Sequence, residues 1–136
     1  MVKKAVRGKE ISVSVINEVG ILAKITSFLV NHGINVEAVA GAARRVGEAA
    51  VLMFVTDDNL AAVNILNEHG LQSMENDIII VELENTPGSL KNISEILAQN
   101  GINIEYIYGT TCSGGCPAKM ILATSNDEIA IRILKG

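Results

Sequence analysis

Hydrophobic and polar residues alternate in two short segments of the chain, residues 10–16 and 79–83. The apolar positions are Ile11, Val13, Val15, Ile79, Val81 and Leu83. Because successive side chains of a strand point to opposite faces, each segment is predicted to be a half-buried strand. After each segment the apolar spacing changes to three or four residues, as in Leu22, Ile25, Leu29 and in Leu90, Ile93, Leu97. This spacing predicts an amphipathic helix after each strand, ended by Gly33 or Gly101.

The two halves of the chain align without a gap when one is shifted by 68 positions. The matched pairs include Asn17 with Asn85, Gly20 with Gly88, Leu22 with Leu90, Gly33 with Gly101, Asn35 with Asn103, and Gly41 with Gly109. A unit of this length holds several elements and occurs only twice, which favours a duplicated domain over a solenoid. We therefore expect two modules, residues 1–76 and 77–136.

Further segments complete the same order of elements in each half. Strands are expected at residues 34–39, 49–56 and 71–74 in the first half and at 102–107 and 118–124 in the second; helices are expected near residues 60–66, capped by Asp57 or Asp58, and 129–134. The order β, α, β, β, α, β closes most simply as an antiparallel sheet with both helices on one face. The predicted fold class is α+β, with two tandem ferredoxin-like modules.

The second half has no residues left for a last strand after its second helix. An exposed position is therefore predicted in its sheet. The N-terminal segment around residues 2–6 or another subunit would fill this position, because an unpaired strand edge invites pairing. A three-stranded module is the simpler alternative.

The turns at residues 17–22 and 85–90 are the candidate binding sites. Each leads from a strand into a helix, whose first N–H groups lack internal acceptors and attract a carboxylate. Gly20 and Gly88 allow a ligand to approach the backbone, and the amides of Asn17 and Asn85 offer both donors and acceptors. Asn and Gly most often form turns with no further role, but two copies in register favour a binding surface.

The strand, the N-x-P-G-x-L turn, the helix and the following G-I-N strand resemble ACT domains in both halves. The resemblance implies amino-acid binding and regulation of amino-acid metabolism. It also implies that modules pair through their second strands into an eight-stranded sheet, with effector sites at the seam. The implied sites combine Asn17, Gly20, Ile21 and Leu22 with Asn103, and Asn85, Gly88, Ser89 and Leu90 with Asn35. Val19 departs from the motif, which has proline at this position.

Composition narrows the classes of partner. The chain of 136 residues is 49% hydrophobic with a formal net charge of −4, which argues against nucleic-acid binding. The basic cluster of Lys3, Lys4, Arg7 and Lys9 is interpreted as a solvated segment. No run of 18 apolar residues and no signal-peptide pattern is found, so we expect a cytoplasmic protein without a membrane contact.

Cys112 and Cys116 form a C-x-x-x-C pattern in a glycine-containing loop. The spacing leaves open a metal or redox loop and a plain hairpin connection; two cysteines are too few for a disulfide scaffold and fit a reducing compartment. The main hypothesis is a regulatory protein that binds an amino acid, without catalytic residues, metal or cofactor. It would act as a dimer or larger homo-oligomer, with a metabolic enzyme as a possible partner. The alternatives are an interaction protein or detached regulatory subunit with empty sites, and a small enzyme based on the two cysteines.

Overall fold

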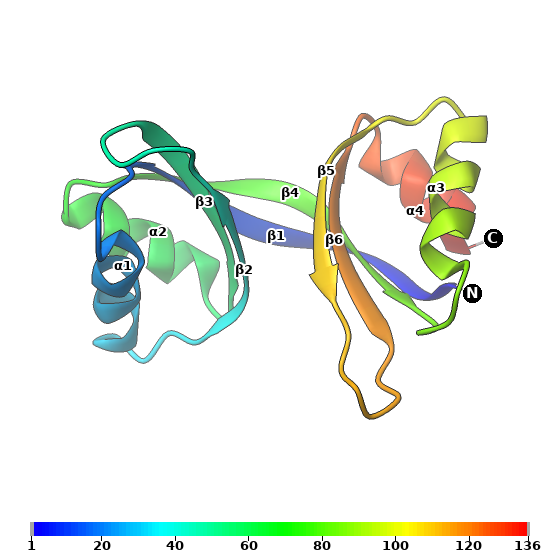
Figure 1. Cartoon of the computed structure of the whole chain (residues 1–136), viewed down its shortest axis with the longest axis horizontal. Helices are drawn as coiled ribbons and strands as arrows, with labels where there is room; N and C mark the ends of the chain where they lie inside the picture. Colours follow the sequence, from blue (N-terminus) through cyan, green and yellow to red (C-terminus); the bar gives the residue numbers. More distant parts are fainter. Residues whose placement is uncertain (1, 136) are drawn as a thin grey trace. The chain divides into compact units, whose positions relative to one another are not determined.

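The computed structural model describes residues 2–135, which form four helices and six strands (Figure 1). In chain order the elements are β1 (Val2–Ile16), α1 (Ile21–Val30), β2 (Val36–Ala42), β3 (Ala49–Thr56), α2 (Asn59–Glu68), β4 (Gln72–Leu83), α3 (Ser89–Gln99), β5 (Ile104–Thr110), β6 (Ala118–Thr124) and α4 (Asp127–Lys135). The strands follow the order β2-β3-β1-β4-β6-β5 and are antiparallel where their register is defined.

The described residues divide into two compact modules. The first module contains residues 9–76, and the second contains residues 77–135 together with residues 2–8. Each has four strands with two helices on one face, α1 and α2 in the first module and α3 and α4 in the second (Figure 1). The predicted α+β class, with two ferredoxin-like modules, is confirmed.

The second module receives its fourth strand from the start of the chain. Residues 2–8 of β1 lie beside β4, and Ala5 is fully buried in the core with Ile79. A Cβ on Gly8 would lie only 2.8 Å from Cδ1 of Ile80, so the side chain of Ile80 occupies the space beside Gly8. Among the described residues no strand follows α4, so the N-terminal segment occupies the position that the sequence left open.

Two strands are longer than the alternation predicts. The segments 71–74 and 79–83 were expected as separate strands, but β4 runs without a break from Gln72 to Leu83. The strand at 10–16 likewise begins at Val2. The expected separation of these two strands was wrong because the sequence at residues 75–77, Glu-Asn-Asp, interrupts the apolar pattern but contains no glycine or proline to interrupt the backbone.

The two hydrophobic cores repeat each other at the spacing of 68 residues. Aligned core positions are Ile11 and Ile79, Val13 and Val81, Ile25 and Ile93, Leu29 and Leu97, Phe54 and Leu122, Ala62 and Ala130, and Leu66 and Leu134. Full burial of one such Leu or Ile side chain contributes about 1.5–3 kcal/mol. The helices therefore dock through the faces that the apolar spacing predicted.

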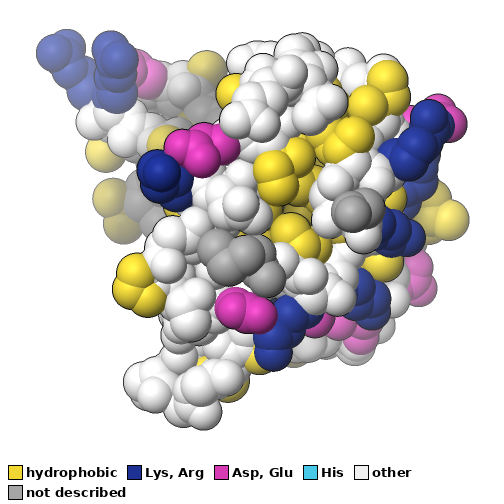
Figure 2. Space-filling model, turned by 90° about the vertical axis from the view of Figure 1, so that its right-hand side faces the viewer, with side chains coloured by type: hydrophobic (Ala, Val, Ile, Leu, Met, Phe, Trp, Pro, Cys, Tyr) yellow, Lys and Arg dark blue, Asp and Glu magenta, His cyan; other side chains and the backbone are white. Residues whose placement is uncertain are grey.

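Charges of both signs are mixed on the surface of the second module that Figure 2 shows. Lys91 pairs with Glu95 at 3.1 Å on α3, and Arg132 pairs with Glu128 at 3.3 Å on α4. These side chains are more than half exposed, so each pair stabilises the helix by only about 0.3–0.5 kcal/mol. Within residues 2–135, no helix is long and apolar enough to cross a membrane.

Candidate effector site

The first turn ends in a helix N-terminus without a side-chain cap. Gly20 adopts φ 86° and ψ 5°, a left-handed conformation that is strained for residues with a Cβ. The N–H of Ile21 donates to the carbonyl of Glu18 at 3.2 Å, and the N–H of Lys24 donates to Gly20 at 3.0 Å. The N–H groups of the two residues between them, Leu22 and Ala23, have no acceptor among the described residues. They are therefore available to an anionic group.

A groove of about 340 Å³ opens beside this turn. It is lined by Val15, Asn17, Ile21, Leu22, Val39, Ala40, Gly41, Ala42, Ala43, Ala50 and Leu52. Asn17 contributes the only polar side chain among these residues, while β2 and β3 supply an apolar wall. The first module thus brings three of the predicted site residues together: Asn17, Ile21 and Leu22.

The hairpin between β2 and β3 fixes Asn17 in place. Its N–H donates to the carbonyl of Glu48 at 2.8 Å, and its carbonyl accepts from the N–H of Gly47 at 2.7 Å. Both backbone groups are therefore used in the turn. The side-chain amide takes no part in these two bonds, and Asn17 lines the groove.

The second turn has the same backbone form. Gly88 adopts φ 92° and ψ −9°, and the N–H of Asn92 donates to its carbonyl at 2.9 Å. Ser89 is buried, with 3% of its surface exposed, and its hydroxyl lies 3.0 Å from that of Thr86. The N–H of Ser89 also donates to the carbonyl of Thr86 at 3.3 Å, so both its hydroxyl and its N–H brace the turn. The N–H groups of Leu90 and Lys91 have no acceptor within residues 2–135.

Each module exposes an equivalent pair of large hydrophobic residues near its turn. In the first module Leu22 is 45% exposed and Val39 is 51% exposed; the aligned residues of the second module, Leu90 and Ile107, are 46% and 39% exposed. Each pair joins the start of a helix to the edge strand of its sheet. The same exposed apolar surface is therefore repeated in both modules.

Asn35 and Asn103 lie away from the turn of their own module. Both are exposed and precede the edge strands, β2 and β5. Their backbones are held by the end of the neighbouring strand: Asn35 bonds Asp57, and Asn103 bonds Ser125. Because Asn17 contacts the hairpin at the other end of β2, Asn35 is separated from it by about the length of that strand, roughly 20 Å. Neither module brings its two predicted asparagines together.

The two cysteines form a disulfide in the hairpin between β5 and β6. The sequence placed them in this connection but gave no basis for choosing a disulfide over free thiols or metal ligands. Within residues 2–135, no group of three or more His, Cys, Asp and Glu residues is arranged to hold a metal ion.

Two further features of the site were not predicted from the sequence. Val39 and its aligned residue Ile107 could not be distinguished from other strand residues in the sequence. Exposed apolar residues on an edge strand can indicate an interaction surface. The bond between Thr86 and Ser89 was indicated more weakly, only by the spacing of three residues between them in the sequence.

Comparison with known proteins identifies the class. The family model for the ACT domain pair matches residues 6–135, so the chain belongs to the ACT domain pair family. ACT domains are regulatory domains without catalytic activity. A search of curated proteins finds no match.

Several solved structures share the fold. A crystal structure of a Bacteroides thetaiotaomicron protein has a TM-score of 0.87 at 25% identity, over 96% of this chain and 88% of that one. The ligand-free regulatory subunit of aspartate kinase from Thermus thermophilus has a TM-score of 0.69 at 17% identity, over 98% and 96%. The corresponding Thermus flavus subunit has a TM-score of 0.68 at 20% identity, with the same coverage.

Proposed function

We propose that the protein is an amino-acid-binding regulatory protein, with an effector site at each of its two strand-to-helix turns. The observation that carries this proposal is the first turn. There, unsatisfied N–H groups, the Asn17 amide and an apolar groove of about 340 Å³ come together. Membership of the ACT domain pair family supports the same function.

The chemistry of the site suits an amino acid. The carboxylate would accept from the N–H groups of Leu22 and Ala23, where the helix dipole also favours negative charge. The amide oxygen of Asn17 would accept from the ammonium group. The apolar lining favours an aliphatic side chain over a charged one, because a buried charge in the groove would have no partner.

The second part of each site would come from another module. We propose that the edge strands pair as the family resemblance implies, so that Asn103 completes the site at Asn17 and Gly20, and Asn35 completes the site at Asn85 and Gly88. The exposed hydrophobic pairs near the turns support this, because such pairing would cover them. Pairing through β2 or β5 of a second copy would make the protein a dimer or larger assembly.

The function would be regulatory, without catalysis, in the cytoplasm. Effector binding would change the free-energy difference between two arrangements of the modules. The size of this change is set by how much more tightly the effector binds one arrangement than the other. A metabolic enzyme is the proposed partner. The similarity in fold to the regulatory subunits of aspartate kinase supports a partner of that class.

Thermal unfolding in the presence of each of the twenty amino acids tests the proposal. A ligand at 100 times its Kd adds about 2.7 kcal/mol. With an unfolding entropy of about 0.29 kcal/mol/K for a chain of this size, Tm would rise by about 9 °C. The rise should shrink in Asn85→Ala and Asn103→Ala, whereas the control Asn31→Ala, at the far end of α1, should retain it.

A flat response to all twenty amino acids would contradict effector binding. It would favour the other regulatory role, a constitutive interaction subunit whose sites are empty. An equal rise in Tm in all three variants would show that the ligand binds, but elsewhere in the protein.

A further inference from the structure

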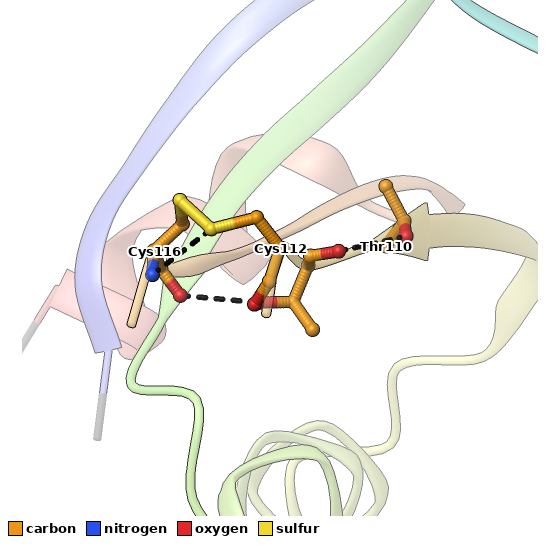
Figure 3. Close-up of a disulfide and its surroundings, with 4 residues drawn as sticks. Thr110, Cys112 and Cys116 are labelled. Carbon is orange, nitrogen blue, oxygen red and sulfur yellow. Dashed lines mark hydrogen bonds between the residues drawn. A yellow bond between two sulfur atoms is a disulfide. The ribbon is translucent and has the colours of Figure 1, made fainter. Parts of the chain in front are cut away.

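The hairpin between β5 and β6, residues 111–117, carries a feature that amino-acid binding does not use. Cys112 and Cys116 are joined by a disulfide across a Cα–Cα distance of 5.4 Å (Figure 3). Gly115 adopts φ 82°, which allows the chain to reverse between the two cysteines. The disulfide therefore closes the tip of the hairpin on itself.

The aligned hairpin of the first module is held without cysteines. Residues 43–48 connect β2 to β3, and their last two residues bond the backbone of Asn17. The ladder between β1 and β3 continues to the pair Ile16 and Ala49, directly beside these bonds. That hairpin is thus fastened to the rest of its module.

In the second module the aligned ladder, between β4 and β6, stops one pair earlier, at Leu83 and Ala118. Pro117 occupies the position that aligns with Ala49. Because proline has no N–H, this position cannot donate a backbone hydrogen bond. Among the described residues, no backbone bond joins residues 111–117 to Asn85 in the way that Gly47 and Glu48 are joined to Asn17, and the disulfide holds this hairpin instead.

The remaining contacts of the hairpin gather around the disulfide. The hydroxyl of Thr111 donates to the carbonyl of Cys116 at 3.0 Å, and the N–H of Cys116 donates to Sγ of Cys112 at 3.2 Å (Figure 3). The second bond lies within the five-residue ring of residues 112–116, and the first joins Thr111, just before the ring, to its last residue. Opening the ring would leave these two hydrogen bonds as the only bonds between its ends in the described structure.

The disulfide is accessible to reagents in solution. Cys116 is exposed and Cys112 is partly exposed. Thiol–disulfide exchange requires access of a thiolate to one of the two sulfur atoms. A ring this short also restricts the unfolded chain less than a long one, so it is a weak device for global stability.

We propose that Cys112 and Cys116 form a reversible thiol/disulfide site for low-molecular-weight thiols of the glutathione type, and that its oxidation state controls the order of residues 111–117. This inference does not depend on the proposed effector. Disulfides in a reducing compartment are usually transient and redox-sensing.

The geometry determines which sulfur atom is attacked and which one leaves. A glutathione thiolate attacks Sγ of Cys116, the more exposed of the two residues, and forms a mixed disulfide there. The S–S bond breaks, and its electron pair leaves on Sγ of Cys112, where the N–H of Cys116 stabilises the thiolate. A second glutathione thiolate then attacks the glutathione sulfur of the mixed disulfide and displaces Cys116 as a thiolate. The two cysteine thiolates take up the protons released by the two glutathione thiols. One protein disulfide and two glutathione thiols become one protein dithiol and one glutathione disulfide.

Mass spectrometry of the native protein in glutathione buffers tests the site. Thiols are trapped by alkylation, and backbone hydrogen exchange is followed in the oxidised and reduced forms. We expect complete reduction by millimolar glutathione without denaturant, and at least tenfold faster exchange of the Cys116 amide, which donates to Sγ of Cys112, after reduction. Residues 43–48 serve as the internal control and should exchange at the same rate in both forms. Resistance to glutathione until denaturant is added, or unchanged exchange of the Cys116 amide, would overturn the proposal.

Single serine variants test the asymmetry, since each leaves one thiol. Cys116→Ser keeps the backbone N–H of residue 116, so Cys112 in this variant should react with iodoacetamide at lower pH than Cys116 does in Cys112→Ser. A shift of the pH–rate profile by half a unit or more is expected. Coincident profiles, or the reverse order, would contradict the assigned leaving group.

Discussion

Replacing Gly88 with alanine tests whether the second turn depends on a left-handed residue. Gly88 has φ 92°, and nothing lies within 4 Å of a Cβ placed there, so the effect is one of backbone conformation without a clash. The left-handed conformation costs a residue with a Cβ about 1–2 kcal/mol. Alanine also restricts the unfolded chain, which offsets about 0.4–1 kcal/mol. The expected net loss is about 0.5–1.5 kcal/mol, or roughly 2–5 °C in Tm for a chain of this size.

The assay is thermal unfolding followed by circular dichroism, with two companion variants. Gly88→Asn should lose less than Gly88→Ala, because asparagine tolerates the left-handed region better. Gly114→Ala is the matched control in the same module: its φ is not positive and the nearest atom, Sγ of Cys112, lies at 3.9 Å. Equal Tm values for Gly88→Ala and Gly114→Ala would refute the reasoning.

Other substitutions probe the fold through matched pairs. Asp58→Ala removes the side chain that accepts from the first turn of α2 and should cost about 1 kcal/mol in urea unfolding. Leu66→Ala should cost about 2–5 kcal/mol because Leu66 is fully buried, whereas Leu60→Ala on the same helix, 68% exposed, should change stability by less than about 0.5 kcal/mol. Gly109→Ala should destabilise more than Gly41→Ala, since its Cβ would meet a backbone carbonyl of β6, while that of Gly41 would meet the movable end of a side chain. Equal losses within either pair would contradict the packing described.

Much of the fold could be predicted from the sequence because the duplication supplies each signal twice. The alternation at Ile11 and Val13 recurs at Ile79 and Val81, and both sets are buried. Strand continuity could not be predicted in the same way. Between Met74 and Ile78 the apolar alternation lapses, and whether the backbone continues there depends on hydrogen bonds to a neighbouring strand.

The candidate site was predicted in part. The turns, their glycines and their asparagines follow from local sequence, because a strand, a turn and a helix are short-range features. The exposure of Val39 and Ile107 depends on which strand lies at the edge of the sheet, a property of the tertiary fold. The bond between Cys112 and Cys116 depends on the approach of their Cα atoms, which the C-x-x-x-C spacing permits without requiring it.

Nuclear magnetic resonance of the backbone amides, recorded while an amino acid is added, tests the central claim most directly. The N–H groups of Leu22, Ala23, Leu90 and Lys91 have no acceptor in the described structure and would gain one from the ligand carboxylate. An effector amino acid should produce saturable chemical-shift changes centred on these four amides and on the turns before them. Unchanged spectra with all twenty amino acids, or saturable shifts confined to other parts of the protein, would contradict it.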